Sequence, residues 1–216
     1  MNKRKYSVLF YVPNLIGYMR LLFLITAWIF YDNIYVFLPF YAAAAFLDGI
    51  DGWAARMMGQ CSAFGAWLDV LVDNVGRSLL WTKLYPWGVF VSCLEWSVFV
   101  CTHTLGHQWK AAFGAAPQWV KTVMDNGFYT PVGAFTVAGL HALPPYLYIL
   151  GHLPPSLHNV SPILLYAPAV ILAAGRVLAL AVELWCIKTH ILQLLSTDEN
   201  HELNILTRDL HTDPSN

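Results

Sequence analysis

The chain has 216 residues, of which 57% are hydrophobic and only 12% are charged. This composition excludes an ordinary soluble domain of the same size, which would carry more surface charge, and favours a polytopic membrane protein in a lipid bilayer. The net charge of −1, without an extended basic run, also argues against nucleic acid as a partner.

Six apolar segments are long enough to approach or cross a hydrocarbon layer about 30 Å thick. They lie at residues 14–31, 33–58, 63–84, 86–109, 127–150 and 161–194. We therefore predict an all-α integral membrane fold with six transmembrane helices. The second segment is apolar only as far as Phe46, so its helix should continue to the headgroup level with Asp48, Asp51 and Arg56.

Short connections are predicted wherever turn residues cluster between these segments. Such clusters are Tyr31-Asp32-Asn33, Gly59-Gln60-Cys61-Ser62, Tyr85-Pro86 and the stretch from Gly151 to Pro162. Residues 110–126 are more polar and predict a longer connection or a surface helix. With no internal repeat in the sequence, we expect one membrane domain over residues 1–216, with a cytosolic segment at 1–11 and a polar, flexible cytosolic tail at 195–216.

The distribution of basic residues outside the spans predicts the orientation. In a six-span arrangement one face carries Lys3, Arg4, Lys5, Lys110, Lys121, Lys188 and Arg208, with Arg56 at its edge, and the other carries only Lys83. The positive-inside rule then places both termini, and the connection between the second and third spans, in the cytosol.

Four aspartates flank that connection. Asp48 and Asp51 are three residues apart, and Asp69 and Asp73 are four apart, so each pair shares one face of its helix. Each ionised aspartate at the centre of a membrane helix costs roughly 2.5–3.5 kcal/mol on insertion scales, which bound cations would reduce. Hard oxygen ligands favour Mg²⁺ or Mn²⁺, and four carboxylates are enough for two divalent ions.

Nearby residues suit phosphate chemistry. A guanidinium at Arg56 could hold phosphate oxygens through two hydrogen bonds. Gly49, Gly52 and Gly65 would let helices or a nucleotide approach closely. Divalent ions here would neutralise the charge that develops during in-line displacement at phosphorus, and one carboxylate must remain to accept a proton.

The sequence from Asp51 to Asp73 resembles the signature of the CDP-alcohol phosphotransferases, DGxxARx8GxxxDxxxD, with the additional upstream aspartate at Asp48. Residues 12–20, VPNLIGYMR, resemble the opening of eukaryotic phosphatidylinositol synthases within that family. The resemblance is strong over about residues 9–75 and weak afterwards.

The resemblance implies roles for individual residues. Asp48, Asp51, Asp69 and Asp73 would hold two metal ions, Asp73 would also act as the base, and Gly52, Arg56 and Ser62 would bind the CDP-lipid. It further implies an enzyme, in the endoplasmic reticulum membrane, that transfers a phosphatidyl group from CDP-diacylglycerol to an alcohol, with inositol favoured. Serine, glycerol phosphate and a lipid alcohol stay open as acceptors. A transporter and an inactive paralogue are the less favoured classes.

One departure concerns the acceptor side. Asn74 stands where phosphatidylinositol synthases usually carry Arg, and the basic region that they have between the fourth and fifth spans is reduced here to Lys110 and Lys121. Arg77, one helical turn beyond Asp73, could supply the missing charge. We therefore take Arg77 and Lys121 as candidate acceptor-binding residues.

Several polar residues of the spans allow two interpretations. Arg20, Arg77 and Arg176 could contact a ligand or form internal ion pairs with Glu95 and Glu183. Asn14 could cap the first helix, which we favour, or contact the metal site. His103 and His107 are expected to form a polar inner face rather than a metal site. Ala42 to Ala45 and Ala173-Ala174-Gly175 indicate close packing within one subunit, or a homodimer face.

Overall fold

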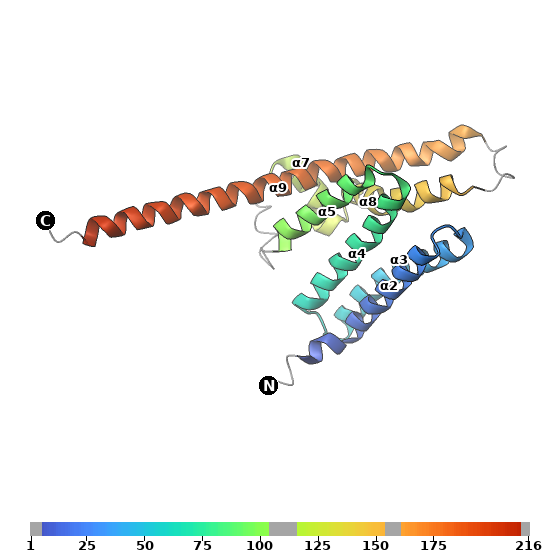
Figure 1. Ribbon diagram of the computed structural model, residues 1–216, viewed down its shortest axis with the longest axis horizontal. Coiled ribbons are helices and arrows are strands. Elements are labelled where there is room, and N and C mark those ends of the chain that lie inside the picture. The colour runs from blue at the N-terminus through green and yellow to red at the C-terminus, as the bar shows by residue number, and fades with distance from the viewer. Residues whose placement is uncertain (1–5, 104–115, 154–160, 213–216) are drawn as a thin grey trace.

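The computed structural model describes residues 6–103, 116–153 and 161–212, and in these ranges the regular structure is entirely helical (Figure 1). The long helices are α2 (Val12–Ile29), α3 (Ile34–Met57), α4 (Ala63–Leu84), α5 (Gly88–His103), α8 (Pro131–Gly151) and α9 (Pro162–Thr212). Shorter elements are η1 (Val8–Phe10), α7 (Gln118–Met124) and η4 (Asp125–Phe128). The prediction of an all-α fold is confirmed for these residues.

Each long helix occupies one of the six predicted apolar segments. By length and hydropathy, four of the described helices could cross a membrane: α2, α3, α8 and α9. The apolar helix α5 is shorter, and α4 carries the charged residues Asp69, Asp73, Arg77 and Lys83 along its length. A membrane protein is therefore supported, whereas six spans and cytosolic termini stay predictions.

The helices form two groups that α4 joins. Helices α2 and α3 pack as an antiparallel hairpin, α8 packs on α9, and α5 packs on both α4 and α9 (Figure 1). One core cluster lies among α2, α3 and α4 and contains Leu24, Ala44, Leu68 and Val72. This cluster fixes α2 against α4, which brings the middle of α2 next to the aspartates.

The first predicted connections are confirmed, with turns at residues 30–33, 58–62 and 85–87 separating the helices. Helix α3 runs unbroken to Met57, so Asp48, Asp51 and Arg56 are helical as expected. Within the polar stretch 110–126, residues 118–124 form α7, while residues 104–115 lie outside the described part, as does most of the connection from 151 to 162.

The predicted capping role of Asn14 is wrong. Helix α2 begins at Val12, with Tyr11 at the cap position and Pro13 in the first turn, where proline is tolerated. Asn14 is only 1% exposed and donates a hydrogen bond from Nδ2 to the backbone oxygen of Val8 at 2.6 Å. It therefore ties the preceding segment to the helix instead of capping it.

The small residues of α9 serve close packing within one chain, as expected. A Cβ on Gly175 would lie 2.5 Å from the backbone oxygen of Phe135, and one on Gly139 would lie 2.3 Å from the backbone nitrogen of Arg176. Only glycine allows α8 and α9 to approach this closely. A homodimer stays a prediction.

The carboxyl-terminal tail differs from its prediction. We expected a flexible segment from residue 195, but α9 continues as a helix to Thr212 and projects past the other helices (Figure 1). Residues 195–212 contain neither proline nor glycine, and several are good helix formers. Since nothing in this stretch terminates a helix, the span simply continues.

Candidate active site

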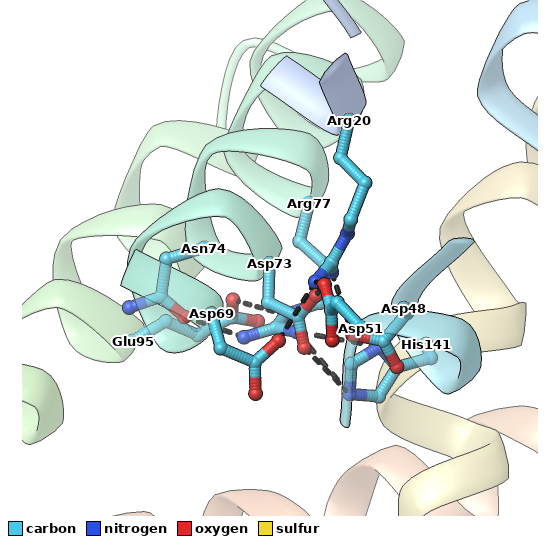
Figure 2. Close-up of polar contacts among 9 residues, drawn as sticks. All are labelled: Arg20, Asp48, Asp51, Asp69, Asp73, Asn74, Arg77, Glu95 and His141. Carbon is cyan, nitrogen blue, oxygen red and sulfur yellow. Dashed lines mark hydrogen bonds and ion pairs between the residues drawn. The ribbon is translucent and has the colours of Figure 1, made fainter. Parts of the chain in front are cut away.

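The four aspartates converge from two successive helices, α3 and α4, both of which pack on α2. Asp48 and Asp51 come from the last part of α3, and Asp69 and Asp73 come from the first half of α4. Their carboxylates point toward one another, as Figure 2 shows. The side chain of Asp51 is 9% exposed and that of Asp73 is 24% exposed, whereas those of Asp48 and Asp69 exceed 40%. The cluster is thus open on one side.

A buried arginine from a third helix lies among these carboxylates. Arg20 of α2 is 2% exposed, and its Nη1 donates to Asp51 Oδ2 at 2.6 Å and to Asp69 Oδ1 at 2.7 Å. Its Nη2 lies 2.6 Å from both Asp48 Oδ1 and Asp73 Oδ1. Arg20 was expected to pair with a glutamate or a ligand, so its contact with all four aspartates was missed.

The donor set fits a divalent cation. Carboxylate oxygens of Asp48, Asp51 and Asp69 lie within 4.8 Å of one another. Around Mg²⁺, with ligand distances of 2.0–2.1 Å, oxygens on opposite sides are about 4 Å apart, so small side-chain adjustments would close the three around one ion. Asp73 lies next to these three aspartates, because its carboxylate contacts the same Arg20 guanidinium. The identity of the ion and the binding of a second one stay predictions.

A cleft of about 160 Å³ adjoins the aspartates. Its lining comes from the start of α2, the end of α3, the α3–α4 turn and the start of α4, and includes Asp51, Gly52, Arg56, Ser62, Gly65 and Asp69. The three residues assigned to the CDP-lipid by resemblance are therefore brought together beside two of the proposed metal ligands. Within the described ranges Arg56 has no ion-pair partner, so its charge is available.

The floor of the cleft is shaped by the start of α4. Ser62 caps this helix, since its Oγ accepts a hydrogen bond from the Gly65 nitrogen at 3.0 Å. A Cβ on Gly65 would lie 2.8 Å from Asn14 Oδ1 and 3.1 Å from Ser62 Oγ. Glycine at position 65 therefore keeps the cleft open and allows the cap.

Since the resemblance assigns this cleft to the CDP-lipid, it implies that Gly65→Ala should weaken binding of that lipid. The added methyl group would push Asn14 and Ser62 apart and fill part of the cleft, so we expect the KM for the CDP-lipid to rise roughly tenfold, equivalent to about one hydrogen bond to a charged group. Gly49→Ala is the matched control, because no atom lies within 4 Å of its added Cβ. Equal KM values for the two variants would contradict this role.

A second polar group surrounds Asp73 on the side away from the cleft. Asp73 Oδ2 lies 3.7 Å from Arg77 Nη1 and 3.9 Å from His141 Nε2 (Figure 2). Arg77 also donates to Asn74 Oδ1 through Nη2. His141 comes from α8 and was not anticipated, because a lone histidine in an apolar segment gives no spacing signal.

The charges of Arg77 and Arg176 are neutralised by buried glutamates. Arg77 Nε donates to Glu95 at 2.8 Å, and Arg176 contacts Glu95 at 3.3 Å and Glu183 at 2.9 Å. Of the two interpretations that the sequence left open, internal ion pairing with these glutamates holds for Arg77 and Arg176. Although Arg77 lies beside Asp73 as expected, its charge is already balanced.

The remaining candidates lie apart from these groups. Lys121 is in α7, and within the described part of the chain it forms no hydrogen bond or ion pair with the site residues named above. His103 is exposed and stacks on Phe99, with ring centroids 5.5 Å apart, so its placement on an inner face is wrong. His107 lies outside the described residues.

The chain is similar in sequence to several curated proteins. The most similar curated proteins include CDP-diacylglycerol–inositol 3-phosphatidyltransferases of Drosophila melanogaster, 38% identical over 119 residues, and of Candida albicans, 40% identical over 102 residues. A third, from Arabidopsis thaliana, is 35% identical over 127 residues. The match to the Drosophila protein covers 53% of this chain and 53% of that relative. The corresponding shares are 42% and 44% for the Candida protein, and 56% and 54% for the Arabidopsis protein. The chain therefore matches only about half of the length of these relatives.

No solved structure shows a significant match to this chain. The family model described as CDP-alcohol phosphatidyltransferase, however, matches residues 10–173, which include α2, α3, α4 and all four aspartates. This match covers most of the chain and the complete candidate site. The chain therefore belongs to the CDP-alcohol phosphatidyltransferase family.

Proposed function

We propose that this protein transfers a phosphatidyl group from CDP-diacylglycerol to inositol, giving phosphatidylinositol and CMP. The observation that carries the proposal is the convergence of the four aspartates beside the cleft that contains Gly52, Arg56 and Ser62. Family membership supports the donor chemistry, and the relatives, which are inositol phosphatidyltransferases by name, support the acceptor.

The donor would bind in the cleft. Arg56 would donate hydrogen bonds to the pyrophosphate, and Gly52 and Gly65 would leave room for the nucleotide against the helix backbones. Asp48, Asp51, Asp69 and Asp73 would hold the divalent ions, Mg²⁺ or Mn²⁺. When bound, such ions would neutralise charge on the phosphate oxygens during displacement.

Asp73 is suited to accept the acceptor's proton. Its Oδ1 is held by Arg20, while its Oδ2 is beyond hydrogen-bond distance of both Arg77 and His141. Oδ2 would take the proton of the acceptor hydroxyl as that oxygen bonds to the phosphorus that carries diacylglycerol. The bond from this phosphorus to the CMP oxygen breaks, and CMP leaves with the electron pair. No covalent enzyme intermediate is needed.

The charges near Asp73 favour an uncharged acceptor. Arg77 and Arg176 are balanced by Glu95 and Glu183, so these four residues carry no net charge to attract a phosphate. Glycerol phosphate is therefore less suited than a neutral polyol. The His141 side chain is 41% exposed and could form a hydrogen bond with an acceptor hydroxyl.

The positive-inside distribution favours a site that opens to the cytosol, where nucleotides are present. The resemblance to eukaryotic phosphatidylinositol synthases favours the endoplasmic reticulum membrane. Protease protection of epitopes placed at residue 1 and in the 58–62 turn, in sealed microsomes, would test the orientation. Cleavage of both epitopes without detergent is expected.

An acceptor comparison tests the proposal. The purified chain in vesicles with CDP-diacylglycerol and Mn²⁺ should release CMP when inositol is added, with much slower release for serine or glycerol 3-phosphate. A lipid product that contains labelled inositol should accumulate in equal amount. CMP release with serine alone would move the protein to another acceptor class, and no release with any acceptor would defeat the transferase proposal.

A further inference from the structure

Arg20 contacts both aspartate pairs at once. Nη1 bridges Asp51 of α3 and Asp69 of α4, and Nη2 bridges Asp48 of α3 and Asp73 of α4. Each terminal nitrogen therefore links the two carboxylate-bearing helices. Helix α2 contributes no carboxylate of its own, so its part in the aspartate cluster is the single positive charge of Arg20 (Figure 2).

The packing of α2 fixes this charge at the depth of the aspartates. Gly17, one turn before Arg20, lies against Leu68, where a Cβ would come within 2.9 Å of Cδ2. Leu24, one turn after Arg20, packs against Gly76 and belongs to the core cluster with Leu68 and Val72. The guanidinium is thus held between two contacts of α2 with α4.

The electrostatic balance explains why a fixed cation is needed. Four carboxylates close together repel one another strongly, the more so where burial limits solvent screening. Arg20 compensates one of these four charges and binds one oxygen of every member. A divalent ion held by Asp48, Asp51 and Asp69 would draw on the same small group of oxygens.

We propose that Arg20 is an internal counter-cation that holds the four aspartates together in the metal-free protein and competes with divalent ions for them. It is a positioning residue, which stabilises the aspartate cluster when no metal is bound and lowers the affinity of the cluster for metal. The inference rests on the metal site of the proposed function. Metal binding can be measured without the transfer reaction, so failure of one proposal is distinguishable from failure of the other.

The test uses the full chain in detergent or lipid nanodiscs, with Mn²⁺ alone as the probe. Thermal unfolding is measured in chelator and over a Mn²⁺ titration, and free Mn²⁺ is followed by electron paramagnetic resonance. Arg20→Gln should lower the Tm in chelator by several degrees. It should also reduce the Mn²⁺ concentration for half-saturation roughly tenfold or more, because a repelling charge a few ångströms away is removed.

Arg176→Gln is the matched control. Arg176 is also buried and paired with two carboxylates, but these are Glu95 and Glu183, outside the aspartate cluster. It should lower the Tm in chelator and leave the half-saturation concentration unchanged. Arg20→Lys keeps the charge but lacks the two terminal nitrogens that contact all four aspartates. It should raise the Mn²⁺ affinity, as Arg20→Gln does, but by a smaller factor.

The outcomes separate the two possible roles of Arg20. Weaker or unchanged Mn²⁺ binding in Arg20→Gln would overturn the proposal, because it would mean that the guanidinium does not compete with the ion. If Arg20→Gln does not fold in chelator, purification in Mn²⁺ should recover it, and Arg20→Lys provides the affinity measurement. Weaker or unchanged binding in Arg20→Lys would overturn the proposal equally.

Discussion

Asp73→Asn is expected to abolish phosphatidyl transfer and leave the chain folded. The amide oxygen can still accept the hydrogen bond from Arg20 Nη2, so the packing of α2 on α4 should survive. An amide cannot take a proton from the acceptor hydroxyl, and removal of a general base costs typically 10²–10⁴-fold in rate. CMP release at saturating inositol measures this loss.

Binding of the CDP-lipid should persist in Asp73→Asn, because the cleft is lined by other residues. Asp32→Asn provides the matched control, since Asp32 is exposed in the turn between α2 and α3 and the chemical change is the same. This control should retain full turnover. Near-normal turnover in Asp73→Asn would exclude Asp73 as the base.

Glu95→Gln is expected to lower the free energy of unfolding strongly. Glu95 is 4% exposed and is the shared partner of Arg77 and Arg176, so the substitution leaves two buried guanidiniums with too little negative charge. Removing one partner of a buried ion pair costs about 3–5 kcal/mol, and the hydrogen-bonding capacity of glutamine should keep the loss at about 3 kcal/mol. Denaturant titration of the detergent-solubilised chain measures the free energy of unfolding.

Glu199→Gln is the control for that measurement. Glu199 is exposed on α9, and exposed substitutions typically change stability by less than about 0.5 kcal/mol. If Glu95→Gln were no less stable than Glu199→Gln, the buried network would contribute nothing to stability.

Local spacing was enough to predict the parts of the site that lie on one helix. Asp48 with Asp51, and Asp69 with Asp73, share helix faces because residues three or four apart are neighbours on any α-helix. The short 58–62 turn allows the two faces to meet, because α3 and α4 are successive helices, but the rotation that turns both faces inward comes from the packing of each helix on α2. Gly52 and Arg56 were predicted from their residue types as well as from resemblance, and Ser62 from resemblance alone. All three line one cleft with Asp51 and Asp69.

The two incorrect predictions for Asn14 and for the tail beyond residue 195 also have causes in the local sequence. Asn14 resembled a cap because it follows a proline, but helix α2 starts earlier and takes Pro13 into its first turn. The tail beyond residue 195 was judged from its polarity alone. Polarity decides whether a segment is buried, but a helix ends only where a residue or contact terminates it, and α9 continues to Thr212.

The sequence by itself determined the membrane class, the helices and the paired aspartates, because hydropathy and helical period are properties of neighbouring residues. Only the tertiary structure placed Arg20 among those aspartates, 31 residues from Asp51 and 53 from Asp73 along the chain. It also selected Glu95 from the two possible glutamate partners of Arg77 and brought His141 beside Arg77. Such contacts depend on how each helix is rotated and how deeply it sits against its neighbours. Those quantities are set by packing, as at Gly17 and Leu68 or at Gly139 and Gly175, and no spacing within a single helix reports them.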